Sequence, residues 1–300
     1  MDGLITPRLL LACRLAYGIL PDGSLAAMPS QQLIGMGEPI QTFILGPDKI
    51  DAALFGIAAD AMILAFRGTI IVQSPDTLSR IADWLNDADA IPVPGAGLPG
   101  HVHRGFLLAL DALWPAVLPI LTAALADPAN AQKPLYVTGH SKGGSMAFLA
   151  AARIAATLVP QPMPYPTRVQ CITFAAARAG DVAFANAFDH LVPHAIRYEY
   201  QDDIVPHVPP QDILATGLAD FPELGISAPT GAGLFESAGT LAFFDWTGAT
   251  CVDSFSLQLK RAYHILECLT AKGFDGIVAD HSIATISGYA RDVFAPAAAV

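Results

Sequence analysis

The sequence predicts an α/β fold, in which a central, mostly parallel β-sheet is covered by helices on both faces. Runs of β-branched and aromatic residues alternate along the chain with runs rich in Ala and Leu, the pattern of repeated strand–helix units. The strand-like runs are apolar throughout rather than at every second position, as expected where helices bury both sides of a sheet. The 300 residues suit one α/β domain, so we expect a single domain over residues 1–300.

The expected elements follow from local composition and periodicity. A first helix is expected from about Pro7 to Gly18, and the apolar run "AMILAF" predicts a buried strand over residues 61–66. The later elements are a helix (104–126), a strand (134–138), a helix (144–159), a strand (168–176), a helix (180–191), a strand (194–200), a late strand (239–246) and a terminal helix (256–272).

Composition and charge exclude several classes of partner. The chain is 53% hydrophobic and only 14% charged, which indicates a folded protein rather than a disordered one. Its formal net charge of −11 and the lack of a basic stripe exclude a nucleic-acid partner. An anionic membrane surface is disfavoured for the same reason.

Metal and cofactor sites are also not expected. The four cysteines are far apart and form no CxxC pair, which excludes a zinc ribbon or redox motif and favours free thiols over disulfides. The run "GAGLPG" (95–100) matches a dinucleotide fingerprint, but it lies among prolines and follows no strand. His101 and His103 have no third ligand at metal-binding spacing, and we expect "VHRGF" (102–106) to begin a helix.

Two segments bear on localisation. The first twenty residues lack a charged region followed by a clean apolar core, so no signal peptide is visible. Localisation stays open: the chain as read is cytoplasmic, and it is secreted if a leader precedes residue 1. Residues 106–126 are long enough to span a bilayer, but they contain Pro115 and Pro119 and are flanked by helix periodicity. We therefore expect a buried helix and no transmembrane span.

The run "VTGHSKGG" (137–144) is the strongest chemical signal. Gly-x-Ser-x-Gly arises by chance too easily to stand alone, but here it joins a predicted strand to a predicted helix, the setting of a nucleophile elbow. Gly139 and Gly143 lie where a Cβ would collide with the turn. The helix N-terminus stabilises negative charge that develops beside Ser141. We therefore expect Ser141 to be a nucleophile rather than an ordinary loop serine.

A nucleophilic serine needs a histidine base and a carboxylate that orients it, and in α/β-hydrolases they follow the serine in the order acid, then histidine. Asp202 and Asp203 end a predicted strand, so one of the two is expected to orient the base, with the other exposed to solvent. Among the histidines that follow, His264 lies inside the predicted terminal helix. His281 lies at a loop-to-helix junction and is the favoured base.

Several motifs together resemble the class 3, or fungal-type, triacylglycerol lipases of the α/β-hydrolase fold. They occur in that family's order over roughly residues 61–210, and "FRGT" ahead of "GHSKGG" is the most specific pairing. The matching motifs are "LAFRGT" (64–69), "DWLNDADA" (83–90), "VHRGF" (102–106), "VTGHSKGG" (137–144), "ITFAAARAGDVAFANAF" (172–188) and "DIVPHVPP" (203–210).

The resemblance implies roles for individual residues. It selects Asp203 over Asp202 as the triad acid, and His281, followed by Tyr289, resembles the family's C-terminal histidine setting. The oxyanion donors carry over as Thr69 and the backbone N–H of Lys142, with Asp87 steadying the threonine. No cofactor is implied.

The chain departs from the family pattern at two places. Lys142 stands where the family commonly has Leu, and a cation at a helix N-terminus is unfavourable by a few tenths of a kcal/mol. The backbone N–H of Lys142 is present whatever the side chain. We expect the Lys142 side chain to point to solvent or to pair with an acid. The stretch between Thr69 and Trp84 is longer than a short link, and residues 70–82 are expected to form either an amphipathic lid or a fixed surface loop.

The sequence thus predicts a serine carboxylic-ester hydrolase. A lipase acting on acylglycerols or related fatty-acid esters, at a lipid–water interface, is the favoured form. A short-chain carboxylesterase and an acyltransferase on the same scaffold remain alternatives, and a lipid-binding protein without turnover is the non-enzymatic one. Acyl chain length, head-group preference and oligomeric state are beyond the sequence.

Overall fold

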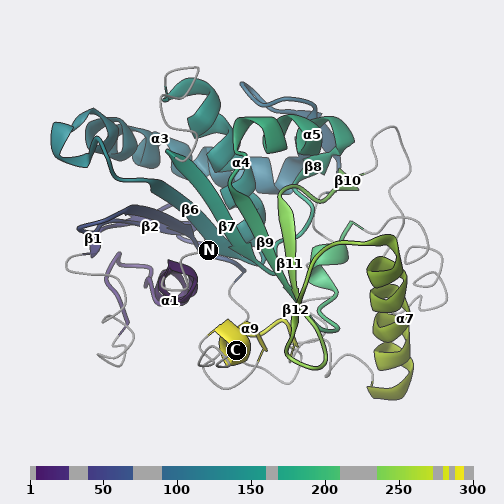
Figure 1. Cartoon of the computed structure of the whole chain (residues 1–300). Coiled ribbons are helices and arrows are strands. Elements are labelled where there is room, and N and C mark those ends of the chain that lie inside the picture. The colour runs from purple at the N-terminus through teal and green to yellow at the C-terminus, as the bar shows by residue number, and fades with distance from the viewer. Residues whose placement is uncertain are drawn as a thin grey trace.

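The computed structural model describes residues 5–26, 40–69, 90–159, 168–209, 235–272, 280–283 and 288–293. A twisted central sheet has helices against both of its faces (Figure 1). One face carries α3 (Arg104–Ala126), α4 (Lys142–Thr157) and α5 (Val182–Leu191), and the other carries α1 (Ile5–Tyr17) and α9 (Gly288–Val293). The long helix α7 (Phe255–Lys272) stands beyond the end of the sheet (Figure 1). The predicted layering is confirmed.

The central sheet has eight strands in the order β1-β2-β3-β6-β7-β9-β11-β12. The five neighbours from β3 to β11 run parallel, whereas β1, β2 and β12 pair antiparallel at the two ends. The strands are β1 (Ile40–Leu45), β2 (Ala52–Ile57), β3 (Met62–Phe66), β6 (Leu135–His140), β7 (Val169–Phe174), β9 (Ala195–Tyr200), β11 (Thr240–Phe244) and β12 (Thr250–Cys251). The register pairs Phe66 with Gly139 and His140 with Phe174, so the carboxyl ends of β3, β6 and β7 meet at one edge.

Two parts of the architecture were not predicted. The hairpin of β1 and β2 escaped notice, although a Gly-Pro-Asp turn signal separates its two apolar runs. A small second sheet has the order β10-β8-β5-β4, from β10 (Phe235–Glu236), β8 (Gly180–Asp181), β5 (His101–His103) and β4 (Pro92–Pro94). The expectation that "VHRGF" begins a helix was therefore wrong for its first two residues, because β5 extends to His103 and the helix begins at Arg104.

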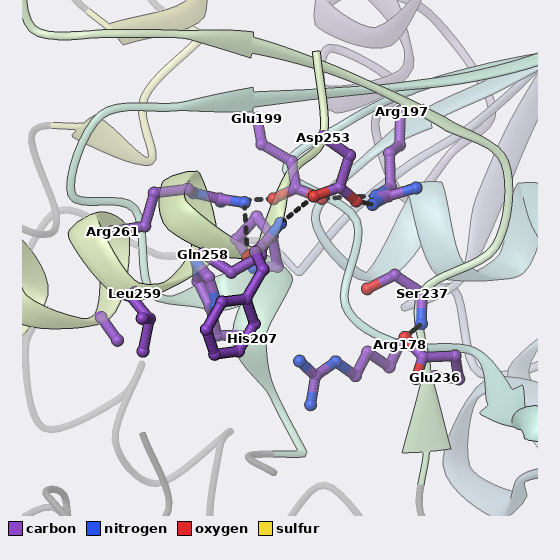
Figure 2. Close-up of a pocket in the computed structure, with 13 residues that line it drawn as sticks. Arg178, Arg197, Glu199, His207, Glu236, Ser237, Asp253, Gln258, Leu259 and Arg261 are labelled. Atoms are coloured by element: carbon purple, nitrogen blue, oxygen red, sulfur yellow. Dashed lines mark hydrogen bonds and ion pairs between the residues drawn. The ribbon is translucent and has the colours of Figure 1, made fainter. Parts of the chain in front are cut away.

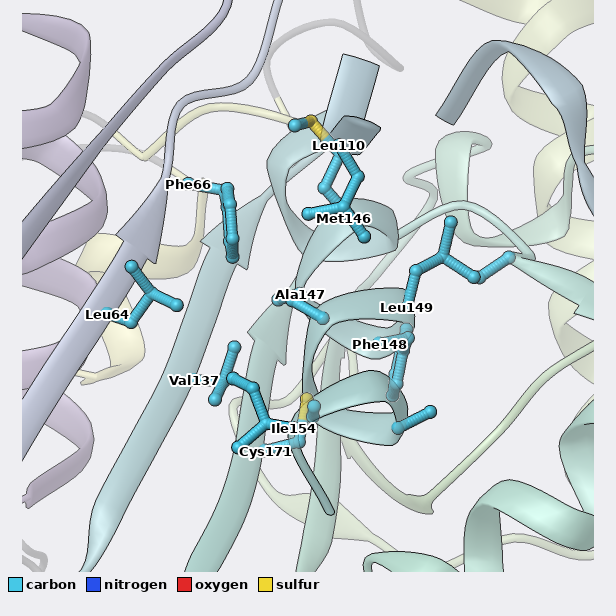
Figure 3. Packing of buried hydrophobic residues seen from close by; sticks show 14 of the residues in the cluster. Leu64, Phe66, Leu110, Val137, Met146, Ala147, Phe148, Leu149, Ile154 and Cys171 are labelled. Atoms are coloured by element: carbon cyan, nitrogen blue, oxygen red, sulfur yellow. The ribbon is translucent and has the colours of Figure 1, made fainter. Parts of the chain in front are cut away.

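Each face of the sheet has its own apolar core, and β3 shows how the sequence divides between them. Leu64 packs in the core under α3 and α4, while its neighbours Ile63 and Ala65 pack in the core under α1. This alternation is the two-residue period of a strand buried on both sides. Against the first core lies α4, whose small residues such as Ala147 bring the helix close to the strands (Figure 3).

Among the described helices, α3 is long and apolar enough to cross a membrane by length and composition. One stripe of its side chains is buried in the first core, at the helical spacing of Phe106, Leu110, Leu113, Val117 and Leu121. Pro115 and Pro119 lie on the exposed side. The helix thus contributes one face to the core, as predicted for a buried helix.

Candidate active site

Ser141 lies at the sharp turn between β6 and α4. Its backbone adopts φ 58° and ψ −133°, a left-handed conformation that costs a non-glycine residue of order 1–3 kcal/mol. The turn is held by hydrogen bonds from the Ser141 N–H to the Phe174 carbonyl (3.0 Å) and from the Gly144 N–H to the Ser141 carbonyl (2.9 Å). A strained backbone conformation that the surrounding hydrogen bonds hold in place is typical of a functional residue rather than of an ordinary loop.

The two glycines around Ser141 are required by close backbone contacts. A Cβ at Gly139 would collide with the backbone of Gly143, and a Cβ at Gly143 would collide with the Phe66 carbonyl on β3. No side-chain movement can relieve either collision, because the obstacle is backbone in both cases. The Gly-x-Ser-x-Gly spacing is therefore a steric requirement of this turn, as predicted.

Asp203 and His281 form a buried pair at the same sheet edge. Asp203 follows β9 and is fully buried, and His281 is 6% exposed. His281 Nδ1 lies 3.1 Å from Asp203 Oδ1 and 3.0 Å from Oδ2. The Val205 N–H donates to Asp203 Oδ1 over 3.0 Å. The structure thus pairs His281 with Asp203, and the role of Asp203 as the acid of a catalytic triad stays a prediction.

Asp202 corrects a second expectation. It was expected to be exposed to solvent, but it is 8% exposed. Its Oδ1 accepts a hydrogen bond from Trp246 Nε1 (2.8 Å), and its N–H donates to Asp280 (3.1 Å). His264 stacks on the same Trp246 with ring centroids 3.8 Å apart. Asp202 thus anchors the turn after β9 to its neighbours while Asp203 faces the histidine.

Tyr289 completes the surroundings of Asp203. Its hydroxyl donates to Asp203 Oδ2 over 2.8 Å. Burial, followed by the nearby Asp203 charge, raises the pKa of Tyr289 well above its ordinary value. The phenol therefore remains a hydrogen-bond donor at neutral pH. With Tyr289, Val205 and His281, the buried carboxylate has donors on both oxygens, which a buried charge requires.

His140 joins the elbow to the segment carrying His281. Its Nε2 donates to the His281 carbonyl over 2.8 Å, and its Nδ1 lies 2.9 Å from the Tyr17 hydroxyl. The rings of His140 and His281 lie 4.6 Å apart, centroid to centroid. Burial, then the neighbouring His281, holds the pKa of His140 well below its usual value. A neutral His140 must carry its proton on Nε2, because the carbonyl only accepts, and Nδ1 then accepts from Tyr17.

Sequence reasoning missed both His140 and Tyr17. His140 carried one usable signal, its place immediately before Ser141. Tyr17 carried none, because 123 residues separate it from His140. Together they hold the main chain of His281 beside the residue that precedes Ser141.

The two expected oxyanion donors follow the ends of the neighbouring strands β3 and β6. Thr69 follows β3, and its buried Oγ1 has no hydrogen-bond partner within the described part of the chain. Lys142 is the first residue of α4, so its N–H has no acceptor within the helix. The Lys142 side chain pairs with an acid, one of its two expected fates: Nζ lies 2.6 Å from Asp51 Oδ1, with 15% and 8% of the two side chains exposed.

Two predicted features lie outside the described residues, namely Asp87 and the segment 70–82. Where the chain is described, no group of three His, Cys, Asp or Glu residues could hold a metal ion. His101 instead contacts Asp181 (3.3 Å), and His103 stacks on Phe106. All four cysteines are free thiols, as favoured.

Comparisons with known proteins agree with this geometry. A family model for lipase (class 3) matches residues 63–213, about half of the chain. A lipase of Rhizopus niveus is 30% identical over 195 residues, covering 64% of this chain and 46% of that protein. Phospholipase A1-II 4 of Oryza sativa subsp. japonica is 30% identical over 188 residues, covering 56% and 45%. The chain spans less than half the length of these curated relatives.

Solved structures show the same fold. The Lip2 lipase of Yarrowia lipolytica superposes with a TM-score of 0.64 at 16% identity, covering 95% of this chain and 93% of that one. The triacylglyceride lipase of Rhizomucor miehei gives 0.61 at 21% identity, covering 84% and 82%. The predicted α/β-hydrolase fold is confirmed.

Proposed function

Because the chain belongs to the lipase (class 3) family, we propose that it is a serine carboxylic-ester hydrolase, a lipase that cleaves acylglycerols or related fatty-acid esters. The observation that carries the proposal is the strained, buried Ser141 at a strand–helix turn, with the buried Asp203–His281 pair next to its neighbour His140. A lipid-binding protein without turnover would need neither the strain nor the buried hydrogen bond between Asp203 and His281.

In the proposed reaction, the Ser141 hydroxyl attacks the ester carbonyl while His281 takes its proton. Asp203 accepts the Nδ1–H of His281, which leaves Nε2 as the base and stabilises the imidazolium that forms. His281 then returns the proton to the leaving alcohol. A water molecule activated by His281 cleaves the acyl-enzyme and releases the fatty acid.

The negative charge on the carbonyl oxygen is proposed to be held by Thr69 and by the N–H of Lys142. Support comes from the unpartnered Thr69 hydroxyl and from the first N–H of α4, a helix end that favours negative charge. Donors aimed before the charge forms need no reorganisation during the reaction, and losing one costs about 100- to 1000-fold in rate.

The proposal extends to parts of the chain beyond the described residues. Asp87 is proposed to steady Thr69, and residues 70–82 are proposed as a lid over the acyl site. The partner is then a lipid or ester substrate met at a lipid–water interface. Rates measured above and below the solubility limit of one ester test the lid: a rate jump on forming an interface supports it, and smooth saturation contradicts it in favour of a soluble esterase.

The nucleophile is tested by Ser141→Ala with Ser145→Ala as the matched control. Ser145 is a buried serine on α4 whose hydroxyl bonds the Ala177 carbonyl (2.9 Å), away from the reaction. With a chromogenic short-chain ester and an acylglycerol, Ser141→Ala is expected to lower kcat by about 10⁴-fold or more, and Ser145→Ala by less than about tenfold. A fluorophosphonate should label the wild type and Ser145→Ala only. Retained hydrolysis by folded Ser141→Ala refutes the proposal.

Product analysis with an added acceptor alcohol separates hydrolysis from acyl transfer. Free fatty acid as the main product supports the hydrolase. A new ester as the main product would identify the acyltransferase alternative instead.

A further inference from the structure

A cavity of about 300 Å³ lies between the turn η3 (Val205–His207), the first turns of α7 and the residues that follow β10 (Figure 2). This volume is at the lower end of the range for small-molecule sites. None of Ser141, Asp203 and His281 is among the described residues that line it. The cavity is thus separate from the proposed reaction centre, although η3 begins two residues after Asp203.

The most deeply buried charged group in the cavity lining has one more cation than anions. Glu199 is 3% exposed and accepts from two buried guanidinium groups, Arg197 Nε (2.8 Å) and Arg261. Two cations around one carboxylate leave one positive charge in this buried group. Arg178 adds a third guanidinium to the lining (Figure 2), and the carboxylates of Glu236 and Asp253 bring the formal charge of the whole lining to zero. Asp253, which also contacts Arg197, has 48% of its side chain exposed, so water screens its charge. An anion in the cavity would offset the buried excess.

His207 offers that anion a hydrogen bond. The residue is 7% exposed and lines the cavity (Figure 2), and its buried Nε2 has no hydrogen-bond partner among the described residues. Burial, followed by the charges of Arg261, Arg178 and Arg197, keeps the pKa of His207 well below its usual value, so the ring is neutral. A buried nitrogen without a partner is unfavourable. An Nε2–H tautomer can donate to a ligand oxygen.

Part of the exposed lining of the cavity is apolar. Phe255 and Leu259 line it, and they are 78% and 38% exposed. Tyr263, 66% exposed, continues the stripe. The spacing of four residues places all three on one side of α7, where they form an apolar track from the cavity to the surface.

We propose that this cavity binds the anionic head group of an amphiphile, and that its occupant is a fatty acid. The carboxylate accepts from His207 Nε2 and the guanidinium groups, and the alkyl chain follows Phe255, Leu259 and Tyr263. The choice of a fatty acid among amphiphilic anions rests on the proposed function, whose product it is. The site therefore holds product away from Ser141.

Binding is measured on the Ser141→Ala chain by titration calorimetry with octanoate below its micelle concentration, because this chain binds without turnover. One saturable site is expected for octanoate, with binding at least about tenfold weaker for octanol. Ser237→Asp places a carboxylate in the lining, and Ser237→Asn is its neutral isostere. Repulsion at short range predicts at least about tenfold weaker binding for Ser237→Asp and less than about threefold for Ser237→Asn.

Two further readouts do not depend on the Ser237 variants. Phe255→Ala should weaken decanoate several-fold and leave propionate unchanged. In histidine-labelled protein, the ¹⁵N resonance of His207 Nε2 should shift with octanoate and stay in place with octanol. Absence of octanoate binding, equal effects of the two Ser237 variants, or an unmoved His207 resonance overturns the proposal. Tighter binding of octyl phosphate than of octanoate overturns the carboxylate assignment. An inactive wild type that still binds octanoate refutes the proposed hydrolysis alone.

Discussion

The elbow around Ser141 and the pair of Asp203 and His281 share one sheet edge, but different forces hold them. Ser141 is positioned by its own turn and by the adjacent strands, where backbone meets backbone at Gly139 and Gly143. Asp203 instead receives side chains that are 78 and 86 residues away in the chain, His281 and Tyr289. Ser141 is thus positioned by backbone sterics, and the pair of Asp203 and His281 by side-chain hydrogen bonds between distant segments.

The difference teaches which kind of substitution breaks each region. On the hydrogen-bonded side, an isosteric change that alters one atom should remove activity and leave the fold. On the steric side, a single added methyl group should damage the fold itself, because backbone atoms cannot move aside. His140 connects the two regions and should report on both.

The largest effect is expected from Asp203→Asn, with Asp202→Asn as the matched control. Asparagine cannot stabilise the protonated His281 and favours the wrong tautomer, so kcat should fall by about 10⁴-fold while thermal unfolding changes little. Asp202→Asn keeps an acceptor for Trp246 and should stay within about threefold of the wild type. Equal losses in the two variants would contradict the assignment of the acid.

A large effect on stability is expected from Gly143→Ala. The new Cβ meets the Phe66 carbonyl, so the elbow must shift at a cost of about 3 kcal/mol in the free energy of unfolding. Gly46→Ala is the control, since its Cβ would come no closer than 3.3 Å to its neighbours. Denaturant unfolding measures both. A Gly143→Ala protein as stable as the control would contradict the claim that backbone contacts exclude a Cβ at position 143.

An effect on stability of similar size is expected on lowering the pH from 6.5 to 5.0. His140 and His207 are buried, and burial lowers both pKa values well below their usual range. The unfolded chain takes up these protons first, so stability is intact above about pH 6.5 and falls below it, by about 1.4 kcal/mol per pH unit for each histidine.

Chemical unfolding at several pH values measures this slope. His140→Gln and His207→Gln should each reduce it by about half. A stability that is flat between pH 6.5 and 5.0 would show that the two rings are not held neutral.

The smallest effect on turnover is expected from Lys142→Leu. The backbone N–H is retained, so kcat should stay within about threefold of the wild type. The free energy of unfolding should fall by about 1–3 kcal/mol. The reason is that the Asp51 side chain, which is only 8% exposed, loses the ammonium group with which it pairs. Adding Asp51→Asn should restore part of that loss. A hundredfold drop in kcat would mean that the charged side chain takes part in catalysis.

Local patterns predicted most of the fold. The helices α3 and α4 and the strands β6, β7 and β9 are expected from runs whose composition and period are readable within a window of about ten to twenty residues. The short strands of the second sheet were not predicted, because two or three residues are too few to show the alternation of a strand.

The sequence by itself determined the elbow, because Gly139, Ser141 and Gly143 stand together where one predicted strand passes into one predicted helix. The carbonyl groups of Phe66 and Phe174 on the adjacent strands complete its surroundings. Chain order narrowed the predicted acid to Asp202 and Asp203, and the position of His281 at a loop-to-helix junction favoured it over His264 as the predicted base. Tertiary structure decided the burial of Asp202, the chain from Tyr17 through His140 to the His281 carbonyl, and the charged cavity around His207. These depend on distances between residues far apart in the chain, which only the packing of distant segments sets and which no local period encodes.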